Sequence, residues 1–328
     1  RNIAIGNGSM ENGTMTGADN TAVGHNALNL LGAANYNTAV GAYTLDATTT
    51  GSNNIAVGRS ALGVNTTGAS NTAVGTFALD ANTTASNNTA LGYGALTANT
   101  TGADNVSIGS GTMGQNLTGA QNIAVGTNSL ANTTASNNTA VGNAAGHSIT
   151  SGTNNLTLGM DAGRSGSPGG NIVTGSNEIA LGDENIASAA IQVDWTVASD
   201  ARDKTDFTAL DLGLEFVKDL KPVTYKWDKR SKYGDKTADD YDLTAQTPDG
   251  THKEDWLDIG FKAQEVEALE IAAGYNKDNS TNLVSSHTGD GKQMGLQYSK
   301  FVPILVKAIQ EQNALIEALT ARITELEG

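Results

Sequence analysis

The sequence predicts a mainly β protein: a trimeric parallel β-solenoid of about 17-residue repeats, then a small α+β domain and a C-terminal coiled coil. Three observations lead to this prediction. A short apolar motif ending in glycine recurs about every 17 residues over 1–182, the composition changes sharply near 185–200, and an Ile/Leu heptad pattern ends the chain.

The repeat is defined by the glycine that ends Ala-Val-Gly or a variant of it. The intervals between these glycines are 16 to 18 residues, and a last copy at Gly182 follows after 23 residues. The other glycines of the series are Gly6, Gly24, Gly41, Gly58, Gly75, Gly92, Gly109, Gly126, Gly142 and Gly159. Collagen needs glycine at every third position, and a coiled coil does not tolerate recurring Gly and Asn-Thr-Thr. Disorder is the remaining alternative, but a disordered linker has no reason to keep its apolar positions in register.

Each coil is expected to hold two short strands, one before the glycine and one around Ala-Leu, with Asn-Thr-Thr-Gly at the corner. In one coil the inward residues are expected to be Ala73, Val74, Ala78 and Leu79. Burial contributes roughly 0.8 kcal/mol per CH2, whereas ordering a residue costs about 1–2 kcal/mol. The core of one chain is therefore thin, and three chains sharing an axis would bury more.

The composition separates two regions. Residues 1–185 hold 30 of the 39 glycines and only 12 charged residues, while 186–328 hold 41 charged residues. Cysteine is absent, which excludes disulfides and thiolate chemistry. The net charge of −15 argues against a protein that binds nucleic acid by neutralising phosphates. No apolar run is long enough for membrane insertion, and the start at Arg1 suggests a fragment of something longer.

The Ala-Val-Gly-x-x-Ala-Leu period over 1–182 resembles the parallel β-roll heads of trimeric autotransporter adhesins and repeats in phage tail fibres. The resemblance implies a homotrimer that adheres to a surface. The expected domains are a rod at 1–182, a connector at 183–198, a domain at 199–299 and a trimeric coiled coil at 300–328.

The second region has the pattern of an ordinary globular domain. The expected elements are a helix over 206–220, strands over 223–227 and 257–261, a charged loop over 229–255, a helix from Ala263, and a helix from Tyr298 to the end. The last helix carries a heptad seam with steps of four and three. This seam consists of Leu305, Ile309, Gln312, Ile316, Leu319, Ile323 and Leu326.

A serine and a lysine lie five residues apart at the boundary between the regions, in Ser199-Asp200-Ala201-Arg202-Asp203-Lys204. A serine with a lysine as its base needs no histidine. None of the four histidines has a spacing typical of a catalytic triad or a zinc site, so no metal and no cofactor is expected. On spacing alone, a capping serine and a solvated lysine are the ordinary alternative.

The order of motifs from 199 onward resembles the C-terminal intramolecular chaperone domain of phage endosialidases and tail fibres, also found in myelin regulatory factor. The motifs are 199–204, 213–217, 220–225, 260–266 and 296–298, followed by the coiled coil. The resemblance implies a domain that trimerises, guides folding of the preceding β-structure and then cleaves itself.

Carried over residue by residue, the resemblance makes Ser199 the nucleophile and Lys204 the general base, with the scissile bond between Ala198 and Ser199. It gives Asp200, Arg202, Gln264 and Glu265 positioning roles. Lys262 departs from the family pattern, which usually has Ile or Val there. An exposed lysine amine is protonated at neutral pH, and burial disfavours the ammonium, so packing in an assembled trimer would activate the serine.

The leading hypothesis is therefore a phage tail fibre, made in the host cytoplasm and carried on the virion. Its expected partners are two further copies, other tail proteins and a host receptor, either glycan or protein. Three alternatives remain open: a bacterial adhesin with an uncleaved C-terminal domain, an ice-binding solenoid using Thr66-Thr67 and its repeats, and a glycan hydrolase, disfavoured because no paired carboxylates occur. The acidic residues Asp235, Asp239, Asp240 and Asp242 are expected to form a solvated loop rather than a calcium site.

Overall fold

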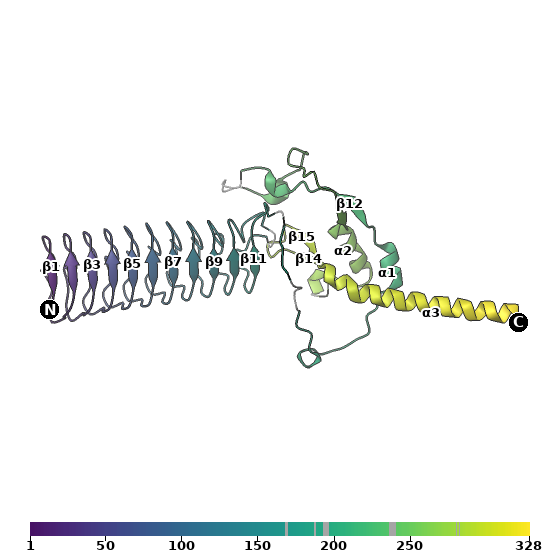
Figure 1. Ribbon diagram of the computed structural model, residues 1–328, viewed down its shortest axis with the longest axis horizontal. Coiled ribbons are helices and arrows are strands. Elements are labelled where there is room, and N and C mark those ends of the chain that lie inside the picture. The colour runs from purple at the N-terminus through teal and green to yellow at the C-terminus, as the bar shows by residue number, and fades with distance from the viewer. Residues whose placement is uncertain (168–169, 187, 193–196, 236–240, 280, 282) are drawn as a thin grey trace. The chain divides into compact units, whose positions relative to one another are not determined.

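The computed structural model describes residues 1–167, 170–186, 188–192, 197–235, 241–279, 281 and 283–328. It divides into two compact units, with the first ending at Ile186. The first is a parallel β-solenoid whose eleven strands form one sheet in sequence order (Figure 1). The predicted fold class is confirmed: a parallel solenoid is followed by a small helical and sheet region and a C-terminal helix.

Each described coil contributes one three-residue strand to the sheet. The strands are β1 (Ile3–Ile5), β2 (Thr21–Val23), β3 (Thr38–Val40), β4 (Ile55–Val57), β5 (Thr72–Val74), β6 (Thr89–Leu91), β7 (Val106–Ile108), β8 (Ile123–Val125), β9 (Thr139–Val141), β10 (Leu156–Leu158) and β11 (Ile179–Leu181). Between most strands the register is the repeat itself, so Thr72 pairs with Thr89 seventeen residues on.

The prediction of two strands per coil is wrong, and so is the inward position of Val74. Side chains alternate along a strand, so only the middle residue, Ala73 in β5, faces the core, and Val74 lies half-exposed beside it. The Ala-Leu segment is a turn rather than a strand. Leu79 has a φ of +51°, in the left-handed region, yet its side chain is completely buried, as is Ala78.

The glycine of each coil is required by close packing between coils. Gly41 has a φ of +136°, and a Cβ atom there would lie 2.6 Å from the carbonyl oxygen of Gly58 in the next coil. Any side chain would clash with that backbone, which explains why Ala-Val is always followed by glycine in the repeat.

Buried asparagines form a ladder through the solenoid that the hydrophobic pattern did not predict. The Oδ1 atom of Asn37 accepts from the backbone N–H of Asn54 at 2.9 Å and from its Nδ2 at 3.1 Å. The same Asn54 side chain also donates to the carbonyl oxygen of Gly68 at 2.9 Å. Each coil thus satisfies buried polar groups of its neighbours, and stability depends on stacking.

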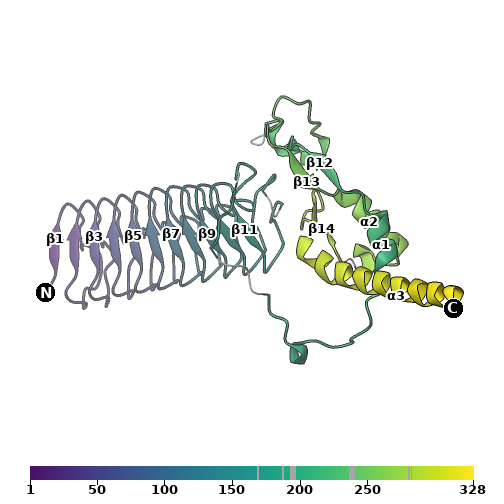
Figure 2. The ribbon, with the colours of Figure 1, turned by 45° about the vertical axis from the view of Figure 1, so that its right-hand side comes forward.

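The described part of the second unit contains three α-helices and two small antiparallel sheets (Figure 2). Its helices are α1 (Leu214–Asp219), α2 (Ala263–Ala272) and α3 (Phe301–Glu327); its strands are β12 (Val223–Tyr225) paired with β13 (Asp258–Gly260), and β14 (Ser285–His287) paired with β15 (Met294–Leu296). The helix predicted over 206–220 is shorter than expected, because it begins only after Gly213. The hairpin β14–β15 was not predicted.

A compact core joins these elements. Its buried members come from α1, α2, α3 and the segments beside them: Leu212, Phe216, Val266, Val284, Phe301 and Ile304. Only the first turns of α3 take part in this core, and the rest of the helix extends beyond it (Figure 1). No helix among the described residues is long and apolar enough to cross a membrane.

Candidate functional site

The structure brings Ser199 and Lys204 into direct contact. The Nζ atom of Lys204 donates to the Oγ atom of Ser199 at 2.6 Å. A short 3-10 turn, Ala201–Asp203, lies between them and reverses the chain, and the backbone N–H of Lys204 donates to the carbonyl oxygen of Ala201. A spacing of five residues therefore places nucleophile and base within hydrogen-bonding distance, which is the geometry that serine activation requires.

Asp200 and Arg202 hold this turn. The Asp200 carboxylate accepts from the backbone N–H of Arg202 at 2.9 Å, and it receives two hydrogen bonds from the guanidinium Nε atom at 3.1 Å and one from Nη2 at 2.6 Å. The hydrogen bonds from the Arg202 side chain and backbone lower the pKa of Asp200. The carboxylate caps the turn in its charged form, so the pair fixes the loop on which Ser199 and Lys204 lie.

The contact between serine and lysine is open to solvent in the single chain. Ser199, Lys204 and the preceding Ala198 are all exposed. An ammonium only donates hydrogen bonds and has no lone pair with which to take the proton of a serine hydroxyl. The structure therefore shows a nucleophile and a base within hydrogen-bonding distance but not buried.

Gln264 and Glu265 lie on α2 and have no described contact with the pair at 199 and 204. Glu265 forms an ion pair with Lys262 at 2.8 Å across the first turn of the helix, and this hydrogen bond lowers the pKa of Glu265. Lys262, the residue that departs from the family pattern, thus has a local partner. Gln264 is exposed.

A buried carboxylate that the sequence did not single out ties α2 to the hairpin β14–β15. Glu270 is fully buried and accepts from the backbone N–H groups of Leu283, Val284 and Ser285 and from the Ser285 hydroxyl. One turn earlier, Glu267 contacts the Nε2 atom of His287 at 2.7 Å. The only sequence signal for Glu270 is an acid among apolar helix positions.

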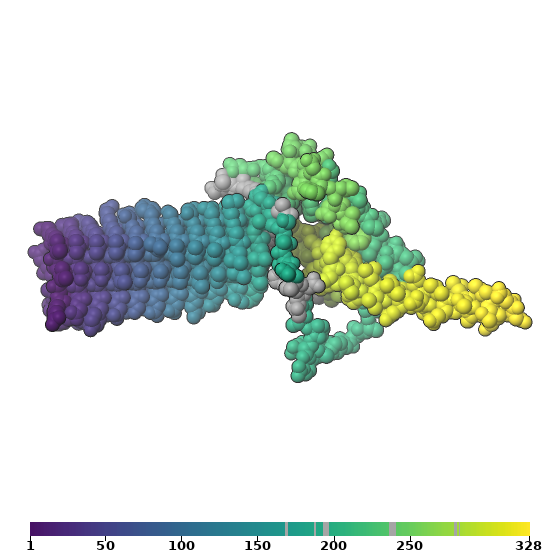
Figure 3. All heavy atoms as spheres, viewed as in Figure 1, coloured from purple at the N-terminus to yellow at the C-terminus, as the bar shows by residue number. Residues whose placement is uncertain are grey.

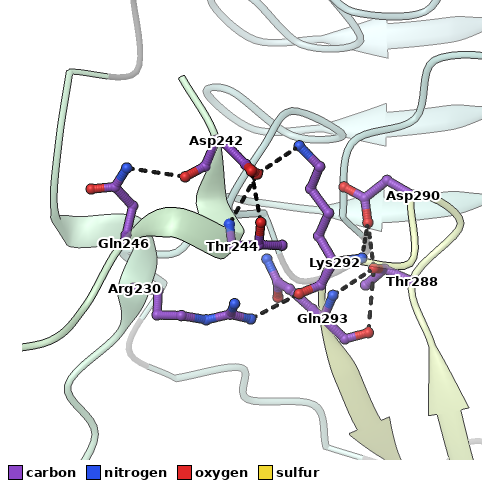
Figure 4. Close-up of polar contacts among 8 residues, drawn as sticks. All are labelled: Arg230, Asp242, Thr244, Gln246, Thr288, Asp290, Lys292 and Gln293. Carbon is purple, nitrogen blue, oxygen red and sulfur yellow. Dashed lines mark hydrogen bonds and ion pairs between the residues drawn. The ribbon is translucent and has the colours of Figure 1, made fainter. Parts of the chain in front are cut away.

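Described residues of the charged segment 229–255 bond to Lys292 in the hairpin β14–β15. Lys292 donates from Nζ to the Asp242 carboxylate at 3.1 Å, while Arg230 donates to the carbonyl oxygen of Lys292 at 2.8 Å (Figure 4). Asp242 also accepts from the backbone N–H and the hydroxyl of Thr244. These contacts, those from Thr244 being the largest, lower its pKa to about 2.

Asp242, expected in a solvated acidic loop, keeps 47% of its side-chain surface exposed while it pairs with Lys292. Asp239 and Asp240 lie outside the described residues. Among the residues that the structure does describe, no group of three or more histidine, aspartate or glutamate side chains is arranged to hold a metal ion.

The long helix α3 leaves its predicted seam uncovered. Ile304 and Ala308 are buried on one side, whereas Ile309, Ile316 and Leu319 are 53–61% exposed on the other. An exposed stripe of large apolar side chains on an otherwise charged helix is typical of a helix that forms a coiled coil with other helices.

The threonine rows proposed for ice binding are partly used inside the solenoid. The Oγ1 atom of Thr66 donates to the carbonyl oxygen of Thr83 at 3.0 Å, and that of Thr83 donates to Thr100 at 3.3 Å. Hydroxyls engaged in this ladder are not free to order a surface lattice, which weakens this alternative.

Part of the C-terminal region is similar to a known protein family. Residues 199–275 match the model of the family described as chaperone of endosialidase, which comprises autoproteolytic chaperone domains. The match begins at Ser199 and ends shortly after α2, so it includes the paired serine and lysine. The predicted resemblance of this segment is confirmed. No curated protein and no solved structure gives a match.

Proposed function

We propose that this chain is the end of a viral tail fibre, in which a binding rod is followed by a chaperone that trimerises, directs folding of the rod and then cleaves itself off. The family match at 199–275 together with a preceding β-solenoid supports this function. The observation that carries the self-cleavage is the 2.6 Å contact between Lys204 Nζ and Ser199 Oγ at the first residue of the match.

The proposed reaction breaks the peptide bond between Ala198 and Ser199. The neutral Lys204 amine takes the Oγ proton, and Oγ attacks the carbonyl carbon of Ala198. The lysine ammonium returns the proton to the Ser199 nitrogen as the C–N bond breaks, which leaves an ester between the two residues. Water then hydrolyses the ester, giving a carboxylate on Ala198 and a free amine and hydroxyl on Ser199.

In this proposal, assembly of three chains buries the Lys204 amine, which is exposed in the single chain. Burial by further copies would favour the neutral amine that the reaction needs. The uncovered seam of α3 is the surface that we assign to the trimer contact. On the rod, the last residue of every described strand is aliphatic, and many are exposed, such as Val57 at 37% and Leu91 at 47%. This row gives three rods a continuous apolar surface to share.

Mass measurement of the purified chain tests the proposal. We expect a fragment that begins at Ser199. Ser199→Ala and Lys204→Arg should stay at full length, the latter because a guanidinium does not give up its proton near neutral pH. Asp203→Ala, in the same turn but outside the pair, is the matched control and should still cleave. Cleavage that survives in Ser199→Ala would falsify the role of the serine.

A further inference from the structure

Aromatic side chains are rare in the solenoid, and most of them gather on one side of it. Only four phenylalanine, tyrosine or tryptophan residues occur within 1–182, and three of these, Tyr43, Phe77 and Tyr93, lie in nearby coils at the turn that follows the glycine. His25 occupies the same turn in the coil before Tyr43, and Arg59 occupies it in the coil between Tyr43 and Phe77. Apart from Met160, the other turns in this position carry small or polar residues such as Asn128 and Ala144, so the fold does not require aromatic ones. We call His25, Tyr43, Arg59, Phe77 and Tyr93 the aromatic stripe.

The stripe runs along the rod with one large side chain per coil. His25, Arg59 and Tyr93 occupy one position of the turn in alternate coils, and Tyr43 and Phe77 occupy the next position in the coils between. The rings of His25 and Tyr43 meet edge to face with centroids 5.1 Å apart. Arg59 lies 5.3 Å above the ring of Phe77, which contacts Tyr93 edge to face at 6.1 Å.

Two of the rings remain available to a ligand. Tyr43 is 40% exposed and Tyr93 is 63% exposed, whereas the Arg59 guanidinium covers one face of Phe77. On the face that Figure 3 shows, the solenoid surface is continuous from coil to coil. Rigid rings on a rigid scaffold offer contact area with little conformational entropy to lose on binding.

Two half-buried carboxylates lie beside the stripe. Burial raises the pKa of Asp46, and the nearby charge of His25 opposes that shift. Burial likewise raises the pKa of Asp80, and Arg59 opposes it. The coils therefore place two carboxylate acceptors next to the donors and rings of the stripe, and with the one guanidinium of Arg59 the net charge is small.

We propose that the aromatic stripe is a lateral binding surface for an oligosaccharide. Aromatic faces pack against the apolar C–H faces of sugar rings, while guanidinium, carboxylate and phenol groups hydrogen-bond their hydroxyls. Five coils at ~4.8 Å spacing give a track of about 19 Å, the scale of a short glycan chain. This inference rests on the proposed function as a host-binding fibre and names the class of receptor.

The small area of the stripe argues for a glycan over a protein partner. The exposed parts of the five side chains offer roughly 300 Å2 of accessible surface, whereas a stable protein interface buries ~800 Å2 on each side. The small net charge also gives no reason to expect a strongly acidic or basic partner.

A glycan array tests the assignment with the full chain, left to process as it normally does. The array should carry neutral and acidic oligosaccharides, and the strongest binder is then titrated calorimetrically. We expect Tyr43→Ala combined with Tyr93→Ala to weaken binding about tenfold or more. Tyr36→Ala is the matched control, because Tyr36 is 62% exposed and its φ of +60° equals that of Tyr43 within a degree, yet it lies outside the stripe. It should bind as the unmodified chain does.

Three results would overturn the proposal. Absence of binding to every oligosaccharide on the array excludes the ligand class, and an equal loss in Tyr36→Ala excludes the stripe as the site. A changed oligomeric state of the Tyr43 and Tyr93 double variant, measured by light scattering, would instead make the stripe a contact between copies. The mass of the same samples reports cleavage at Ser199 independently, so a failure of the proposed processing is recognised separately.

Discussion

Glu270 is the side chain whose removal should most damage the C-terminal unit. It lies fully buried on α2, and its two carboxylate oxygens accept four hydrogen bonds from the segment that begins the hairpin β14–β15. Three of the donors are backbone N–H groups, at 2.8, 2.5 and 2.9 Å for Leu283, Val284 and Ser285. In Glu270→Ala these donors lose their acceptor while the hairpin still needs to pack on the helix.

The size of the loss follows from the number of orphaned groups. A buried donor without an acceptor costs about 1–3 kcal/mol, so three backbone groups give an upper range of roughly 3–9 kcal/mol. Leu283 is half-buried, and water entering the vacated space should satisfy part of the demand. We therefore expect Glu270→Ala to lower the free energy of unfolding by about 3–5 kcal/mol. Glu270→Gln keeps one acceptor oxygen and should lose about half as much.

Urea unfolding followed by tryptophan fluorescence measures this difference. All three tryptophans lie outside the eleven coils, so the signal reports the C-terminal half without the rod. Chain concentration must be the same for every variant, because assembly shifts apparent stability. Glu215→Ala is the control: its ion pair with Lys218 is exposed, and its loss should change stability by less than ~1 kcal/mol. A loss below ~1 kcal/mol in Glu270→Ala would refute the reasoning.

Three further perturbations test acid sensitivity, assembly and templating. The folded pKa of Asp242 is about 2, below its ordinary 3.8, so its contribution to the free energy of unfolding is complete above about pH 4 and is lost as the pH falls toward 2. Pepsin should therefore cut 229–255 faster as the pH falls through that window. An Asp242→Ala chain that resists pepsin equally well would contradict this. Ile316→Asp in the seam of α3 should abolish trimers, measured by light scattering, and cleavage, measured by mass. Ala321→Asp, opposite the seam, should leave both unchanged. An Ile316→Asp monomer that still cleaves would show that cleavage does not depend on assembly. Residues 1–198 expressed alone should aggregate or stay unstructured by circular dichroism, and soluble thermostable trimers would argue against a templating role.

The solenoid could be predicted from the sequence because the same short motif recurs in every coil. The glycine spacing predicted the parallel register and the burial of Ala73 and Leu79, all of which the structure has. The error at Val74 came from treating two adjacent apolar residues as inward, although a strand turns them to opposite faces. The Ala-Leu strand was wrong because the Leu79 backbone is left-handed, a conformation that sequence patterns rarely indicate for leucine.

The contact between Ser199 and Lys204 could also be predicted from the sequence, but the burial of the lysine amine could not. The spacing of Ser199 and Lys204 depends only on a short turn between them, which the chain forms by itself. Among the described residues Lys204 is exposed, and under the proposed function its burial would come from other copies, which one sequence does not place. Glu270 and the hairpin it holds were missed because Ser285-Ser286-His287 has neither the alternation nor the apolar content typical of a strand.

The regularity that makes the rod predictable is also the reason it should need a template. Most coils carry similar strand residues, so a chain shifted by one coil against its neighbours would present nearly the same surface to them. The gap in free energy between correct and slipped trimers is then small compared with the cost of undoing either. The largest break in the repeat lies at its C-terminal end, where β10 and β11 are offset by 23 residues, whereas the other offsets are 16 to 18. A folding domain that follows this irregular coil in sequence can align three chains where register is unambiguous, and coil after coil can then add toward the N-terminus. Cleavage after assembly would remove the only part able to restart the search, which leaves the aligned rod kinetically trapped.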